Sequence, residues 1–233
     1  MYGLYMPKKK GKGREKPVAE PDGGGLDFGQ YLNAVDGAIE CGCDEAGRGS
    51  AAAEVYVAAV ILDPGRPIEG LADSKLLTAA RREELACEIK LKALSWCIEK
   101  ASLEEVEKLN VLHATLLAFE RAVRGLNIKP GRVLIDGDKA PKMPGMQVLC
   151  VIRGDRLVPA ISAASILAKV ARDEAMMGYH LMYPGYGFDV HKGYLTKEHL
   201  QALSRLGPCP IHRKTYRPVE RLIESQPEST GLF

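Results

Sequence analysis

Acidic residues follow three separate apolar runs of this 233-residue chain, where each run gives way to glycine. Asp44 and Glu45 close the first run, Asp136 closes the second, and Asp155 comes shortly after the third. Ligands of α/β proteins collect where the strands of the sheet end, so these four carboxylates could form one cluster. Taken alone, Asp44 and Glu45 could equally be two acids in a solvated turn, but three such positions together indicate a site.

Clustered carboxylates repel one another and need a compensating cation. Hard oxygen donors favour Mg²⁺ or Mn²⁺ over zinc, and such ions support phosphoryl chemistry. The chain has neither a phosphate-binding loop of the form G-x-x-x-x-G-K-[ST] nor a G-x-S-x-G elbow, so the pattern favours phosphodiester hydrolysis. Cys41 and Cys43 have no second cysteine pair to complete a zinc site.

Two further features indicate a nucleic-acid partner. Gly47, Arg48 and Gly49 directly follow the first acids and form a backbone that a ligand can approach closely, and the ribose 2′-hydroxyl is the group that distinguishes RNA from DNA. The second feature is a basic, tyrosine-rich stretch, Tyr186–Arg217, with a local charge of +4. Basic side chains neutralise phosphates and aromatic rings stack on bases or sugars. A C-terminal lobe with packed tyrosines and solvated lysines would give the same composition.

The acids need a sheet to bring them together, and the apolar pattern predicts one. Five apolar runs of strand length alternate with stretches of helical spacing. Ser102 and Glu105 form a capping box, and the small residues from Ala160 to Ala168 permit a helix to approach a sheet closely. This order indicates an α/β fold with a mixed sheet. The expected strands cover 38–44, 53–62, 94–98, 132–136 and 147–152, and the expected helices cover 79–90, 112–126, 161–181 and 197–206.

Composition is that of a soluble globular protein, with 46% hydrophobic and 27% charged residues and a net charge of +2. Residues 1–36 are predicted to be a disordered basic tail, either an electrostatic arm for nucleic acid or a solvated leader. Residues 37–233 are expected to form one domain. No apolar run approaches the length of a membrane span, and no apolar segment follows the N-terminal lysines as in a secretory signal. We therefore expect a cytoplasmic protein whose six cysteines are reduced thiols.

The chain resembles the ribonuclease HII family, the type 2 ribonucleases H, over roughly residues 38–219. Seven motifs occur in the family's order, which makes a chance match improbable. They are Asp44–Gly49, Asp73–Leu76, Val133–Gly137, Arg153–Asp155, Ile161–Val170 with Arg172-Asp173, Tyr183–Phe188 with His191–Tyr194, and His212-Arg213.

This resemblance implies a ribonuclease H-like mixed β-sheet flanked by helices, with a smaller C-terminal helical substrate-binding region at about 183–233. It implies an endonuclease that hydrolyses the RNA strand of RNA/DNA hybrids and incises duplex DNA 5′ of embedded ribonucleotides. A two-metal-ion mechanism would leave 5′-phosphate and 3′-hydroxyl ends. By position, Asp44, Glu45, Asp136 and Asp155 would be the catalytic residues and hold Mg²⁺ or Mn²⁺.

The resemblance also implies substrate-binding residues. Gly47, Arg48 and Gly49 would sense the 2′-hydroxyl, Tyr194 would stack on the sugar that follows the ribonucleotide, and Lys75 would contact a phosphate. The partners implied are RNA/DNA hybrids and ribonucleotide-containing duplex DNA, with no membrane. We expect a monomer, and the sequence identifies no protein partner.

Several residues leave questions open. Asp173 could be a metal ligand, or it could pair with Arg172 or a neighbouring lysine. His191 and His212 are further candidates for substrate contact. The departures from the family pattern are Ser50 for a usual proline, Glu54 in a usually small and apolar stretch, Asp138 for a frequent asparagine, and Tyr216 near a common phenylalanine.

Two rival functions fit parts of the pattern. A catalytically silent nucleic-acid binder could keep the same fold, but it would be expected to have lost some of the four acids, and all four are present. A ribonuclease H-like nuclease that acts on DNA, such as a junction resolvase, would keep them.

Overall fold

The structure is a computed structural model that describes residues 38–71, 74–75 and 77–225. These residues belong to the second of two units of the chain, Val35–Phe233. Residues 1–37 lie outside the described residues, so the basic tail stays a prediction. Among the described residues, no helix is both long and apolar enough to cross a lipid bilayer.

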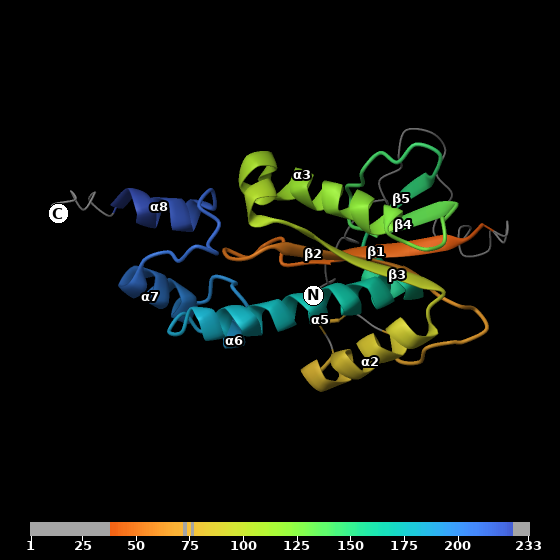
Figure 1. The fold of residues 1–233 in the computed structure, drawn as a ribbon, viewed down its shortest axis with the longest axis horizontal. Coiled ribbons are helices and arrows are strands. Elements are labelled where there is room, and N and C mark those ends of the chain that lie inside the picture. Colours follow the sequence, from red (N-terminus) through yellow and green to blue (C-terminus); the bar gives the residue numbers. More distant parts are fainter. Residues whose placement is uncertain (1–37, 72–73, 76, 226–233) are drawn as a thin grey trace, which may run out of the picture. The chain divides into compact units, whose positions relative to one another are not determined.

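A five-stranded sheet forms the centre of the fold (Figure 1), in the order β3-β2-β1-β4-β5. The pair β1/β2 and the pair β2/β3 are antiparallel, whereas β1/β4 and β4/β5 are parallel. The predicted α/β fold with a mixed sheet is therefore confirmed, and each predicted strand occurs within three residues of its expected bounds. The strands are β1 (Glu40–Ala46), β2 (Val55–Ile61), β3 (Ser95–Ala101), β4 (Arg132–Asp136) and β5 (Gln147–Val151).

Helices cover both faces of the sheet. One face packs on α3 (Leu103–Arg124), and the other packs on α5 (Pro159–Met182) and α2 (Ala79–Lys92), as Figure 1 shows. Helix α5 comes close to β1 because Gly42 has no side chain: a Cβ atom there would lie 2.2 Å from the carbonyl carbon of Ala160. The small residues at the start of α5 are buried as predicted, so the helix is held tightly against the strand that carries Asp44.

The predicted capping box is present at the start of α3. Ser102 accepts a hydrogen bond from the Glu105 amide, and the Glu105 carboxylate accepts one from the Ser102 amide. The helix is interrupted at Asn110, whose φ of 64° is not helical and whose side chain caps the next segment by accepting from the Leu112 amide. This break explains why the sequence predicts a helix start at Ser102 and a separate helix from Leu112.

The C-terminal part of the chain has its own hydrophobic core, which includes Met176 near the end of α5. Three short helices lie here, of which only α7 was predicted: α6 (Phe188–His191), α7 (Lys197–Leu206) and α8 (Arg217–Ser225). An isolated bridge pairs Ala52 with His212, so the chain that leaves β1 is joined directly to this part.

Candidate active site

The sheet brings the predicted acids to one edge. Strands β1 and β4 run parallel, and their register pairs Cys43 with Ile135, so Asp44 and Asp136 come next on adjacent strands. Asp44 is 5% exposed and accepts a hydrogen bond from Ser165 of α5. The Asp136 carboxylate accepts a 2.7 Å hydrogen bond from the amide of Gly154, the residue before Asp155.

Asp155 reaches this edge through a tight turn after β5. Arg153 takes a left-handed conformation, with φ of 60°, and the short helix α4 (Gly154–Leu157) begins directly after it. The Asp155 carboxylate is buried, and its Oδ2 atom lies 3.8 Å from Lys75 Nζ. Lys75 also acts electrostatically on Glu45, so one ammonium group lies between two of the predicted acids. The structure therefore brings all four carboxylates to one region.

Mutual repulsion shows in the acid–base chemistry of the cluster. Burial and the negative charges of Glu45 and Asp136 hold the pKa of Asp44 well above its ordinary value. Burial and Asp136 also raise the pKa of Glu45, against the opposing effect of Arg48, whose Nη1 atom is 3.1 Å from Glu45 Oε1. A bound cation would relieve this repulsion.

The donor chemistry of the cluster fits a divalent ion. Carboxylate oxygens are the hard ligands that Mg²⁺ and Mn²⁺ take in proteins, and the negative charges of Glu45 and Asp136 add to burial in raising the pKa of Asp44. Within the described ranges, no group of three or more His, Cys, Asp or Glu side chains is already arranged to hold a metal ion. Arg48 and Lys75 instead contact Glu45 and Asp155.

A polar network supports the segment that carries Lys75. Arg82 Nη1 donates to the carbonyl oxygens of Ser74 and Leu77, at 2.9 and 2.6 Å. Asp173 pairs with Lys169 at 2.6 Å and with Arg82 at 3.7 Å. Asp173 thus has the supporting ion pair with a neighbouring lysine that the sequence left as one of two alternatives. Asp73, in the same predicted motif, lies outside the described residues.

Next to the acids, the turn of Gly47, Arg48 and Gly49 exposes backbone donors. Gly47 has a φ of +95°, a conformation that favours glycine. The amide groups of Arg48 and Gly49 have no hydrogen-bond partner among the described residues, and both residues are exposed. These N–H groups are therefore available to an oxygen of a ligand, beside the carboxylate of Glu45.

Tyr194 lies against the same turn. Its Cε1 atom is 4.0 Å from the position that a Cβ atom would take at Gly49, and the side chain is 41% exposed. Its backbone is held on both sides: the Tyr194 amide donates to His191, and its carbonyl oxygen lies 3.0 Å from His199 Nδ1. The turn and the ring are far apart in the sequence but form one surface.

Comparison with known proteins agrees with this geometry. Residues 41–219 match the family model described as Ribonuclease HII. The chain belongs to the ribonuclease HII family. It is 60% identical over 185 residues to the ribonuclease HII of Desulforamulus reducens, covering 79% of this chain and 93% of that one. It is 57% identical over 187 residues to that of Natranaerobius thermophilus, covering 80% and 94%. Among solved structures it resembles the ribonuclease H2 of Pyrococcus horikoshii OT3, with a TM-score of 0.66 and 26% identity over 79% of this chain and 97% of that one.

In this ribonuclease HII family member, the candidate histidines are buried, which corrects one expectation. His191 and His212 were candidates for substrate contact, but they are 8% and 0% exposed. They form a cluster with His199, which stacks on His191 and whose Nε2 atom lies 3.0 Å from that of His212. The cluster supports Tyr194 from behind.

Two buried arginines belong to motifs that resemble those of the family, but the sequence alone indicates no role for them. Arg172 and Arg213 lie behind the Gly47–Gly49 turn and are 1% and 2% exposed. The sequence carries only a weak signal: Arg172 lies in the middle of α5, after its small and apolar first half, and Arg213 follows a histidine in a short segment without regular structure. What they contact could be seen only in three dimensions.

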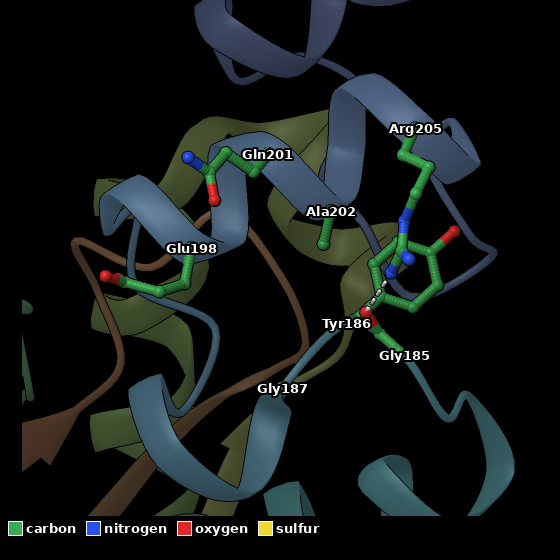
Figure 2. Close-up of a pocket in the computed structure, with 7 residues that line it drawn as sticks. All are labelled: Gly185, Tyr186, Gly187, Glu198, Gln201, Ala202 and Arg205. Atoms are coloured by element: carbon green, nitrogen blue, oxygen red, sulfur yellow. Dashed lines mark hydrogen bonds between the residues drawn. The ribbon is translucent and has the colours of Figure 1, made fainter.

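A separate pocket of about 430 Å³ lies in the C-terminal part of this family member (Figure 2). Arg205 closes one end by donating to the carbonyl oxygen of Gly185, at 3.3 Å. None of the predicted site residues lines this pocket, so it is not the candidate active site. Its lining residues are Gly185, Tyr186, Gly187, Glu198, Gln201, Ala202 and Arg205.

Proposed function

We propose that this chain is a divalent-metal-dependent endonuclease that hydrolyses the RNA strand of RNA/DNA hybrids. It also incises duplex DNA on the 5′ side of an embedded ribonucleotide. One observation carries the proposal: a cluster of repelling carboxylates stands directly beside a turn with open amide groups, and Arg48 of that turn contacts Glu45 of the cluster. Membership of the ribonuclease HII family supports the same reaction.

In this proposal Asp44, Glu45, Asp136 and Asp155 hold two Mg²⁺ or Mn²⁺ ions. When bound, these ions activate a water molecule and stabilise the departing oxygen of a phosphodiester. The protein keeps the ligands in place through the Gly154 amide on Asp136 and the Ser165 hydroxyl on Asp44. Lys75, whose side chain is largely exposed, neutralises a phosphate of the substrate.

Recognition and cutting use different atoms of the ribonucleotide. Water adds to the phosphorus, and the bond from phosphorus to the 3′ oxygen of the preceding nucleotide breaks, leaving a 3′-hydroxyl and a 5′-phosphate. The 2′-hydroxyl of the ribonucleotide takes no part in this step. In our proposal it is bound by the Arg48 and Gly49 amides, while the Tyr194 ring stacks on the sugar of the next nucleotide.

Three labelled duplexes of one sequence test the proposal: an RNA/DNA hybrid, a DNA duplex with one ribonucleotide, and an all-DNA duplex. With Mg²⁺ or Mn²⁺ we expect cleavage of the first two, immediately 5′ of the ribonucleotide in the second, and none with EDTA. Gel mobility and ligation establish the end groups. Equal cutting of the all-DNA duplex would indicate a DNA nuclease, and binding without cutting would indicate a silent binder.

A further inference from the structure

Four carbonyl groups of the Gly47–Ala53 segment are directed to one buried guanidinium. Arg213 is 2% exposed, and its three nitrogen atoms donate to four backbone carbonyl oxygens of this segment. The acceptors are those of Gly47 at 2.8 Å, Arg48 at 3.0 Å, Ser50 at 2.7 Å and Ala53 at 2.8 Å. A planar group with five donors can satisfy such a fan of acceptors, whereas a lysine ammonium cannot.

Arg213 is itself fixed to the segment that it holds. Its own amide donates to the carbonyl oxygen of Ala51 at 2.9 Å. Burial and the neighbouring Arg172 lower the pKa of Arg213 to about 10, so the guanidinium still carries its charge at neutral pH. Glu54, one of the departures from the family pattern, is buried nearby and lowers the cost of this charge.

A second buried arginine joins the turn to the segment of Tyr194. Arg172 Nη2 donates to the Ser50 hydroxyl at 2.7 Å, and Nη1 donates to the carbonyl oxygen of Lys192 at 3.0 Å. Its Cζ atom lies 5.7 Å from the centre of the Tyr194 ring. Arg172 therefore contacts both halves of the exposed surface from its inner side.

These contacts determine which way the amide groups of the Gly47–Gly49 turn face. Since the carbonyl groups of Gly47 and Arg48 are directed inward to Arg213, the amide groups that follow them in the chain, those of Arg48 and Gly49, are left without an internal partner. Arg172 fixes the distance from this turn to Tyr194. Neither arginine needs to touch the substrate to affect what the surface accepts.

We propose that Arg213 is a positioning residue for ribonucleotide recognition: together with Arg172 it directs the Arg48 and Gly49 amides outward at a fixed distance from Tyr194. The inference rests on the proposed function, because it assumes that these amides meet the 2′-hydroxyl. It extends that function to two residues that the substrate does not contact.

The test is Arg213→Lys, which keeps the charge and loses the fan of hydrogen bonds. The readout is the ratio of kcat/KM for duplexes with a 2′-hydroxyl and with a 2′-fluoro group at the cut site, measured well below the melting temperature. We expect this ratio to fall about tenfold or more. Hydrogen exchange of the peptide covering residues 47–53 should become faster at the same time. A general loss of stability would not change the ratio.

Arg132→Lys is the matched control, because Arg132 is also buried and pairs with Glu40 at the opposite end of β4. It should leave the ratio within about twofold of the parent. A parent-like ratio in Arg213→Lys, or an equal fall in both variants, would overturn the inference. A parent enzyme that cuts neither duplex would instead overturn the proposed function, and hydrogen exchange at residues 47–53 would still decide the role of Arg213.

Should Arg213→Lys fail to fold, Ser50→Ala gives a milder test. It removes the hydroxyl that accepts from Arg172 and keeps both guanidinium groups. Its control is Ser162→Ala, a buried serine of α5 whose hydroxyl has no hydrogen-bond partner among the described residues. We expect a lower 2′-hydroxyl to 2′-fluoro ratio only in Ser50→Ala, and equal ratios in the two variants would contradict the proposal.

Discussion

The side chain of Arg172 fills the space that a side chain at Gly47 would need. A Cβ atom built on Gly47 would lie 1.8 Å from Arg172 Nε and 2.5 Å from its Cδ atom. The backbone of Gly47 is also in the left-handed region, with φ of +95°. Glycine at this position therefore serves two purposes: it permits the turn beside the acids, and it lets a buried arginine approach the turn from behind.

Gly47→Ala should be strongly impaired. The backbone conformation alone costs about 1–3 kcal/mol for an alanine, and the methyl group must also displace Arg172 from its contacts with Ser50 and Lys192. We expect lower thermal stability and loss of cleavage at a single ribonucleotide. Gly145→Ala is the control: its φ is +80°, but no atom lies within 4 Å of the added Cβ position. If both variants lost the same activity, the contact with Arg172 would be irrelevant.

Tyr194→Ala should lose more activity at a single embedded ribonucleotide than on a long hybrid. At a single ribonucleotide the ring marks the only junction, whereas a long hybrid offers many alternative positions. We expect kcat/KM on the single-ribonucleotide duplex to fall on the order of tenfold, which corresponds to about 1.4 kcal/mol, and less on the hybrid. Tyr194→Phe keeps the ring and should stay near the parent. Equal losses of Tyr194→Ala on both substrates would remove the stacking role.

The sequence predicted the sheet and the acids well because both depend on local pattern. Each acid closes or closely follows an apolar run, and apolar runs of this length become neighbouring strands whose ends share an edge. Even the break at Asn110 had a local signal, since two helix starts were expected there. The helix α8 was missed, because its few apolar residues are surrounded by charged ones.

The contacts of the buried residues behind the Gly47–Gly49 turn could not be predicted from the sequence. The contacts of Arg213 with the turn join residues more than 160 positions apart, and no periodicity encodes them. The same holds for His212, which the sequence left as a candidate for substrate contact but which is fully buried. Its burial depends on packing against Tyr186 and Phe188.

Asp136→Asn should abolish cleavage without unfolding the protein. The asparagine oxygen can still accept the hydrogen bond of the Gly154 amide, so the turn between β5 and α4 is retained. Its loss of charge should lower kcat by at least about a hundredfold, the scale for removing one electrostatic group from a preorganised site. In EDTA the variant should be at least as stable as the parent, because Asp44 loses a repelling neighbour. Parent-like cleavage of a hybrid at saturating Mg²⁺ would exclude Asp136 from the catalytic residues.

The buried histidine cluster predicts acid sensitivity. Burial lowers the pKa of both His199 and His212 from an ordinary 6.5 to about 4. Between pH 6.5 and 4 the unfolded chain binds protons on these histidines that the folded protein does not. The two histidines therefore do not reduce the free energy of unfolding above pH 6.5, and they lower it as the pH decreases towards 4. A histidine with this full pKa shift lowers the free energy of unfolding by about 3 kcal/mol between pH 6.5 and pH 4. Urea unfolding at several pH values in EDTA measures the slope.

Comparing the pH dependence of stability in two histidine variants separates the effect of the histidines from that of the carboxylates. His199→Gln keeps an acceptor towards His212 Nε2 but cannot titrate, so its stability should depend less steeply on pH between 4 and 6.5 than that of the parent. His113→Gln changes an exposed histidine of α3 and should leave the slope as it is. Equal slopes in parent and His199→Gln would mean that the folded protein accepts a proton on the cluster without loss, contrary to its full burial.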